Sequence, residues 1–163
     1  MKTLLLLRHA KSSRDDPSLR DFDRPLNDRG KSDAKLIGHY LGKKKIAVSA
    51  IVSSPAKRAH STAEIFSRAA GLTNEIGFDE RIYEASTQQL LRVVSEIEST
   101  HESVLLVGHN PGFEDLLTSL TDRNGRMPTA SLASIELGIN KWDDIAPRCG
   151  ELSWFITPKD LKS

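Results

Sequence analysis

Two histidines and two arginines have the side-chain types and the positions in this sequence that could form one reactive site. Arg8 and His9 directly follow the first apolar run of the chain, Arg58 closely follows a second, and His109 closely follows a later one. Imidazole nitrogen atoms are nucleophiles and proton carriers near neutral pH, and guanidinium groups match phosphate oxygens with paired hydrogen bonds. The set therefore indicates chemistry at a phosphate group.

The elements that must position these residues are short strands. The apolar runs 3–7 and 104–107 have the composition of strands buried on both faces of a parallel sheet. Two further short strands are expected at 49–53 and 75–78. Because the carboxyl ends of parallel strands lie on one edge of a sheet, we expect the two histidines and two arginines to converge there. The starts of the two helices that follow Ser53 and His109 would add unpaired backbone N–H donors to such a site.

Helices are expected between these strands. Asn27 is predicted to cap a helix that Gly42 ends. Ser54 is predicted to cap another, with Pro55 at its first position, and Gly71 ends it. The strands and helices thus alternate along the first part of the chain.

The second half of the chain continues the alternation of strands and helices and then ends in two strands without a helix between them. Ser86 and Gln89 fit a capping box before a third helix, and Asn110–Pro111 opens a fourth. The runs 131–137 and 152–157 are expected to be strands with no helix between them, which allows an antiparallel edge. The predicted fold is α/β: a three-layer α/β/α sandwich with a mostly parallel central sheet and helices on both faces. The pattern leaves the order of the strands open.

Composition sets the class of protein. The 163 residues are 38% hydrophobic and 28% charged, which predicts one folded domain over 1–163 rather than a disordered chain. The net charge of +1 indicates neither nucleic acid nor a membrane surface as a partner. The single cysteine, Cys149, excludes an internal disulfide, and the short run Leu4–Leu7 is not a signal sequence. We expect a cytoplasmic protein.

Three kinds of chemistry can use two histidines and two arginines. A metal site would add Asp, Glu or Cys ligands and would gain nothing from adjacent cations. Passive phosphate binding would need the arginines but no histidine at a strand end. Nucleophilic phosphoryl transfer uses all four, because a neutral imidazole attacks phosphorus while the cations hold its oxygens. The guanidinium next to His9 also disfavours the protonated imidazole.

Three segments resemble the histidine phosphatase superfamily, also called phosphoglycerate-mutase-like. They are Leu-Leu-Arg-His-Ala at 6–10, Ser-Pro-Ala-Lys-Arg-Ala at 54–59 and Gly-His-Asn-Pro at 108–111. Arg8-His9-Ala10 matches the Arg-His-Gly signature of that family with Ala in the third place. The short chain and the start Arg-His-Ala-Lys-Ser-Ser are most similar to the compact SixA-type phosphohistidine phosphatases. The resemblance implies a phosphoglycerate-mutase-like fold.

The resemblance also implies a role for each residue. His9 would be the nucleophile that carries a phosphohistidine intermediate, and Arg8 and Arg58 would bind the phosphoryl group. His109 would donate a hydrogen bond to the same oxygens. No metal and no organic cofactor is expected.

Other candidates come from the loop after the first strand and from the segment after the third. Ser12 and Asp15 are candidate phosphate or substrate contacts. The superfamily often protonates the leaving group with a carboxylate after the third strand. Glu80 is the candidate nearer to the family's usual position, and Glu84 is the other.

The function expected from these features is that of a metal-independent phosphatase. Its expected substrate is phosphohistidine on a signalling or phosphotransfer protein, which the resemblance to SixA-type phosphatases implies. The residues agree with this, because the acid stays open between Glu80 and Glu84, and a phosphohistidine, with its weak P–N bond and a leaving imidazole that readily accepts a proton, can react without one. Two alternatives stay open. One is a phosphatase of small-molecule phosphate esters, and the other is a phospho-ligand binding module without turnover.

Overall fold

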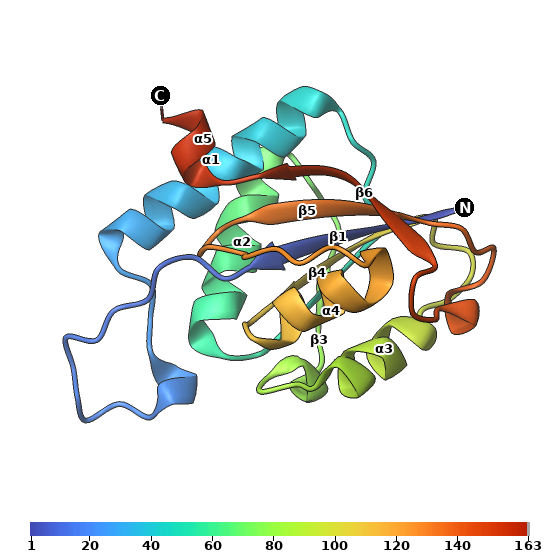
Figure 1. Ribbon diagram of the computed structural model, residues 1–163. Coiled ribbons are helices and arrows are strands. Elements are labelled where there is room, and N and C mark those ends of the chain that lie inside the picture. The colour runs from blue at the N-terminus through green and yellow to red at the C-terminus, as the bar shows by residue number, and fades with distance from the viewer. Residues whose placement is uncertain (163) are drawn as a thin grey trace.

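The computed structural model describes residues 1–162, which form one central sheet with helices on both of its faces (Figure 1). The sheet has six strands in the order β3-β2-β4-β1-β5-β6. The strands are β1 (Lys2–Arg8), β2 (Ala50–Ser53), β3 (Ile76–Phe78), β4 (Ser103–Gly108), β5 (Leu132–Leu137) and β6 (Gly150–Ile156). This is the three-layer α/β arrangement that the sequence predicts.

The first four strands are parallel and the last two are antiparallel to their neighbours. β1 pairs with β4 from Thr3 opposite Ser103 to Arg8 opposite Gly108, and β2 pairs with β4 on its other side. β5 runs antiparallel to β1, and β6 runs antiparallel to β5. The carboxyl ends of β1, β2 and β4 therefore lie on one edge, as predicted.

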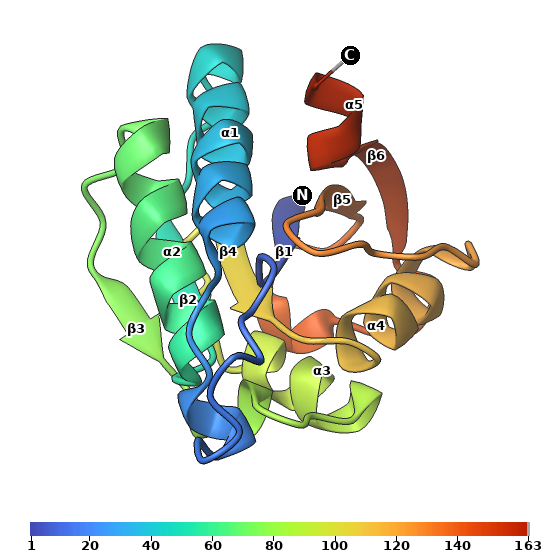
Figure 2. The same ribbon diagram turned by 90° about the vertical axis from the view of Figure 1, so that its left-hand side faces the viewer.

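Helices cover both faces of the sheet. They are α1 (Asp28–Lys44), α2 (Lys57–Ala70), α3 (Thr87–Ser95), α4 (Gly112–Thr121) and α5 (Pro158–Leu161). Figure 2 shows α1 and α2 on one side of the strands and α3 and α4 on the other. Within residues 1–162, no helix combines the length and the apolar content that crossing a membrane would require.

Alternate residues of the central strands fill two separate cores. Leu4 and Leu6 pack with α3 and α4, whereas Leu5 and Leu7 pack with α1 and α2. Successive side chains of a strand point to opposite faces, so a strand that is apolar at every position is buried on both. This double burial fixes the position of the end of β1, where Arg8 is the last residue and His9 follows.

The predicted end of α1 is wrong. α1 continues past Gly42 to Lys44, and Lys45 leaves it in the left-handed conformation with φ 54°. A Cβ atom placed on Gly42 would lie 3.1 Å from the carbonyl oxygen of Ala70, and one on Gly38 would lie 2.5 Å from that of Phe66. These glycines therefore allow α1 to approach α2 closely rather than ending α1.

The start of α2 also differs from the prediction. α2 begins at Lys57 with Ala56 as its N-cap residue, so Ser54 is not the cap. Asn110 does not cap α4 either, because Pro111 precedes its first residue and the Asn110 side chain bonds elsewhere. The capping box of Ser86 with Gln89 is confirmed at α3. Ser54 and Asn110 instead hydrogen-bond within the site at the carboxyl edge.

Candidate active site

His9 follows β1 with its imidazole in a fixed orientation. Its side chain is buried, and its backbone N–H donates to the carbonyl oxygen of Gly108 at 2.9 Å. The ring Nδ1 lies 2.7 Å from the carbonyl oxygen of Ala10. Because a carbonyl oxygen only accepts, Nδ1 carries the proton, and Nε2 of the neutral ring carries the lone pair. The nitrogen atom with nucleophilic character is therefore Nε2.

Arg8 is held through one end of its guanidinium group. Its Nη1 donates to the carbonyl oxygen of Met127 at 2.9 Å, and the side chain of Asn110 donates to the same oxygen at 2.9 Å. The backbone N–H of Met127 in turn donates to the Glu114 carboxylate at 2.7 Å. The Arg8 Nε is buried and makes no hydrogen bond with any residue from 1 to 162.

Arg58 lies in the first turn of α2 and is held by the loop after β1. Its Nη1 donates to the backbone oxygen of Asp21 at 2.7 Å, and its Nη2 donates to the Asp21 carboxylate at 2.9 Å. The hydroxyl of Tyr83 donates to the same carboxylate at 2.7 Å. In the described part of the chain, Nε of Arg58 is buried without a hydrogen-bond partner.

His109 follows β4 and is buried beside His9. The two ring centroids are 5.1 Å apart. The His109 Nε2 lies 2.8 Å from the hydroxyl oxygen of Ser54. Its Nδ1 is buried and has no hydrogen-bond partner within residues 1–162. Since buried polar atoms are almost always paired, unpaired nitrogen atoms on Arg8, Arg58 and His109 indicate a site built for a ligand.

The two imidazoles are neutral at physiological pH. Burial, followed by electrostatic effects of His109, Arg58 and Arg8, lowers the pKa of His9 to about 3, against the opposing hydrogen bond to Ala10. Burial and the charge of Arg58 lower the pKa of His109 to about 4. The direction of the His9 shift is the one predicted from the neighbouring guanidinium, but burial is its largest cause. The site combines two neutral imidazoles with two cations.

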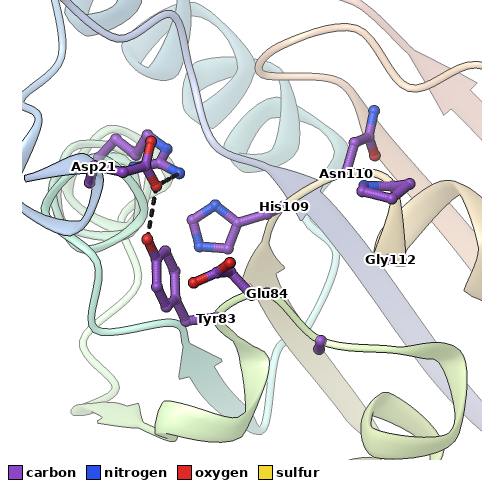
Figure 3. A pocket seen from close by; sticks show the side chains of 9 residues that line it. Asp21, Tyr83, Glu84, His109, Asn110 and Gly112 are labelled. Carbon is purple, nitrogen blue, oxygen red and sulfur yellow. Dashed lines mark hydrogen bonds and ion pairs between the residues drawn. The ribbon is translucent and has the colours of Figure 1, made fainter.

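A cavity of about 360 Å³ opens at this edge of the sheet (Figure 3). It is lined by Asp21, Arg58, Tyr83, Glu84, Ala85, His109, Asn110, Pro111 and Gly112. The hydrogen bond of Tyr83 lowers the pKa of the Asp21 carboxyl, and burial raises the pKa of Tyr83 to about 12. At neutral pH the cavity therefore carries an anionic Asp21 and an uncharged Tyr83.

The structure separates the two candidate acids. Glu84 lines the cavity, and its backbone has φ 53°. Glu80 is exposed on a short 3-10 turn (Glu80–Ile82) and is not among the residues of the cavity wall. Within residues 1–162, no three His, Cys, Asp or Glu side chains are grouped so as to hold a metal ion. Chemically, the site can hold a tetrahedral anion beside an imidazole lone pair.

Comparison with known proteins places this arrangement in a family. The family model of the histidine phosphatase superfamily (branch 1) matches residues 4–90, which is more than half of the chain. The chain belongs to the histidine phosphatase superfamily. It is a phosphatase of that superfamily, and its matched segment includes Arg8, His9 and Arg58.

Relatives of this histidine phosphatase match it over nearly its whole length. The uncharacterized protein Rv1276c of Mycobacterium tuberculosis is 29% identical over 164 residues, which are 94% of this chain and 100% of that protein. The crystal structure of the putative phosphohistidine phosphatase SixA from Agrobacterium tumefaciens is 29% identical, with a TM-score of 0.81 over 96% of this chain and 98% of that one. A protein histidine phosphatase SixA complexed with tungstate shares the fold, with 22% identity and a TM-score of 0.81 over 98% and 99%. The phosphoglycerate-mutase-like fold that the sequence indicates is therefore confirmed, and so is the expected similarity of the chain to SixA-type proteins.

Of the residues that the sequence indicates for this histidine phosphatase, Arg58, Glu84 and His109 line the cavity. Arg8 and His9 do not line it, although the His9 ring lies 5.1 Å from that of His109. The Ser12 hydroxyl accepts a hydrogen bond from Arg24, and the backbone N–H of the exposed Asp15 donates to the Ser13 hydroxyl. Neither Ser12 nor Asp15 lines the cavity. Sequence reasoning missed Asp21, although its place in a polar loop between two prolines next to the Arg-His signature was the available signal.

Proposed function

We propose that this histidine phosphatase removes phosphate from phosphohistidine on a protein, through a phosphohistidine formed on its own His9. The observation that carries the proposal is the set of three buried nitrogen atoms, on Arg8, Arg58 and His109, that have no hydrogen-bond partner within residues 1–162. The His109 ring lies 5.1 Å from the His9 ring, and the charges of Arg58 and Arg8 act on His9. Hydrogen-bond donors arranged in advance are the main means by which proteins stabilise the charge of a transferring phosphoryl group. No metal ion is part of the proposal.

The reaction has two displacement steps. In the first, the lone pair of His9 Nε2 forms a bond to phosphorus, and the bond from phosphorus to the leaving nitrogen or oxygen breaks with its electron pair. Arg8 Nε, Arg58 Nε and His109 hold the phosphoryl oxygens during the transfer. In the second, water attacks the phosphorus, the bond to His9 breaks, and inorganic phosphate leaves. His9 regains its lone pair at the end of each cycle.

The leaving atom needs a proton when it is a poor leaving group. We propose Glu84, rather than Glu80, as the donor, because Glu84 lines the cavity and Glu80 lies outside it. A Glu residue at φ 53° is held in an uncommon backbone region, and such residues concentrate at functional sites. The leaving imidazole of a phosphohistidine accepts a proton readily and depends on Glu84 less than an alkoxide does.

Two observations support a protein substrate. The similar structure from Agrobacterium tumefaciens carries the name of a putative phosphohistidine phosphatase and covers almost the whole chain. Within residues 1–162, the segments 9–27 and 79–86, which lead to the cavity wall, contain only the 3-10 turns Asp21–Asp23 and Glu80–Ile82. Without an inserted domain over the cavity, a phosphorylated side chain on a folded domain can reach it. The second candidate function is hydrolysis of small phosphate esters, which the position of Glu84 favours because an ester requires an acid.

Trapping of the intermediate tests the proposal. Wild-type protein incubated with a radiolabelled phosphohistidine protein should take up an acid-labile, base-stable label on His9, and His9→Ala should neither take up label nor turn over. His60→Ala is the matched control, because His60 is a partly exposed histidine of α2 that lies outside the cavity wall and contacts Glu64 and Phe78. Full turnover by His9→Ala would exclude the mechanism. Phosphate binding without turnover by the wild type would identify a binding module.

The substrate class is tested by comparing rates. The proposal expects a higher kcat/KM for a phosphohistidine protein than for small phosphate monoesters. A higher value for a monoester would replace the first candidate function with the second, while leaving the role of His9 intact.

A further inference from the structure

Ser54 is a buried serine between β2 and α2 whose hydroxyl is not used as a helix cap. Its side chain is fully buried. Its hydroxyl oxygen accepts a hydrogen bond from the backbone N–H of Ala56 at 3.2 Å and lies 2.8 Å from Nε2 of His109. The neighbouring Ser53, equally buried, donates its hydroxyl to the backbone oxygen of Ser54 and has no contact with His109 among the hydrogen bonds of residues 1–162.

The direction of the hydrogen bond between Ser54 and His109 follows from what each atom can do. A buried hydroxyl proton without an acceptor costs free energy, so the Ser54 hydroxyl must donate. Of its two partners, the Ala56 N–H is itself a donor and cannot accept. Only Nε2 of His109 is left as the acceptor, and it must therefore carry a lone pair.

A neutral imidazole has one ring proton, so the proton of His109 lies on Nδ1. This is the nitrogen atom that is buried and has no hydrogen-bond partner within the described residues. We propose that Ser54 is a positioning residue that holds His109 as the Nδ1–H tautomer, so that His109 donates to a phosphoryl oxygen. The inference rests on the proposed phosphoryl transfer for its consequence, but the tautomer itself is a property of the free protein.

The tautomer matters because the other one would reverse the interaction. With the proton on Nε2, a lone pair on Nδ1 would face a negatively charged phosphoryl oxygen and repel it. Protonation of both nitrogen atoms would also supply the donor, but burial and Arg58 keep the His109 ring neutral at physiological pH. The hydroxyl of Ser54 thus determines whether Nδ1 of His109 presents an N–H donor or a lone pair to the phosphoryl group.

The groups around His109 come from four elements. The ring of His9 after β1 lies 5.1 Å away, and the ring of Tyr83 lies 5.5 Å away. The charges of Arg8 and Arg58 disfavour a protonated His109, and that of Asp21 favours it. Glu84 shares the cavity wall. None of these groups is hydrogen-bonded to the His109 ring within residues 1–162, so Ser54 is the group that sets its proton.

The kinetic test compares Ser54→Ala with Ser53→Ala. Loss of one properly oriented donor to a transferring group costs about a hundredfold in kcat, and we expect Ser54→Ala to lose about that much with a smaller change in KM. Its activity should partly recover as the pH falls, because protonation of His109 places an N–H on both ring nitrogens. Ser53→Ala should keep the wild-type kcat and pH profile. Ser54→Thr, which retains the hydroxyl, should recover more activity than Ser54→Ala does.

Nitrogen NMR of the wild-type protein tests the tautomer without substrate or mutation. With labelled histidine at neutral pH, Nδ1 of His109 should give the signal of a protonated ring nitrogen, and Nε2 that of a lone-pair nitrogen. A proton on Nε2, or a Ser54→Ala variant with wild-type kcat and pH profile, would overturn the inference. If the protein turns over no phosphate, the proposed function fails, and the NMR result still decides the tautomer.

Discussion

Acid should destabilise the folded state through the two buried imidazoles of the site. In the folded protein, burial first and neighbouring positive groups second lower the pKa of His9 to about 3 and that of His109 to about 4. In the unfolded chain both return to an ordinary value of about 6.5. The unfolded state then binds more protons than the folded state between these limits, so the free energy of unfolding falls as the pH falls.

The size of the effect follows from the two pKa shifts. The contribution of each histidine to the free energy of unfolding is fully present above the pKa of the unfolded chain. Below that pKa it falls by about 1.4 kcal/mol per pH unit, and it stops falling at the pKa of the folded protein. From about pH 7.5 to about pH 5 each histidine therefore costs about 2 kcal/mol, and the pair costs about 4 kcal/mol. Carboxyl groups with lowered pKa values, such as Asp21 and Asp79, lose their contribution at more acidic pH.

Urea unfolding at these two pH values measures the loss. The wild type should lose about 4 kcal/mol, and the double variant His9→Gln/His109→Gln should lose less than about 1 kcal/mol over the same interval. His39→Gln, a change at an exposed histidine of α1, should behave like the wild type. If the double variant keeps the full acid loss, the neutral buried state of the two imidazoles is refuted.

Three further outcomes are expected. Glu84→Gln should slow hydrolysis of a phosphate ester by about a hundredfold and that of phosphohistidine much less, whereas Glu80→Gln should leave both rates unchanged, in steady-state assays of both substrates. Gly38→Ala should lower the free energy of unfolding by about 2 kcal/mol, because its Cβ would lie 2.5 Å from a backbone oxygen of α2, and Gly125→Ala, with its nearest neighbour at 4.0 Å, should not. EDTA should leave turnover unchanged in the same assay, and a loss restored by added metal would contradict the proposed mechanism.

Much of the site could be predicted because its residues follow strands that local patterns reveal. A strand apolar at every position is covered on both faces, and in a parallel sheet such strands end on one edge. Arg8, His9, Arg58 and His109 could therefore be brought together without knowing the strand order. The antiparallel position of β6 could be foreseen only as a possibility, since two strands without an intervening helix allow several pairings.

The parts that could not be predicted depend on contacts distant in sequence. Asp21 meets Tyr83 across 62 positions, and neither residue carries a local pattern for that contact. Glu84 lines the cavity and Glu80 does not, and the left-handed backbone of Glu84 occurs without the glycine or asparagine that usually indicates it in a sequence. Gly42 looks like a helix end, but it serves the packing of α1 against α2. Ser54 looks like a cap, but its hydroxyl turns to His109.

The four central side chains share one principle of construction. Each uses some of its nitrogen atoms to bond to the protein and leaves another for a ligand. His9 is anchored by Nδ1, Arg8 by Nη1, Arg58 by both Nη atoms and His109 by Nε2. Imidazole and guanidinium suit this arrangement because their nitrogen atoms are fixed relative to one another in a rigid plane, so anchoring one aims the others. A lysine ammonium has a single nitrogen on a flexible stem, so it has no second nitrogen to present to a ligand once the first is bonded to the protein. Preorganisation of this kind explains why two histidines and two arginines, rather than a simple excess of positive charge, mark the site in a chain of net charge +1.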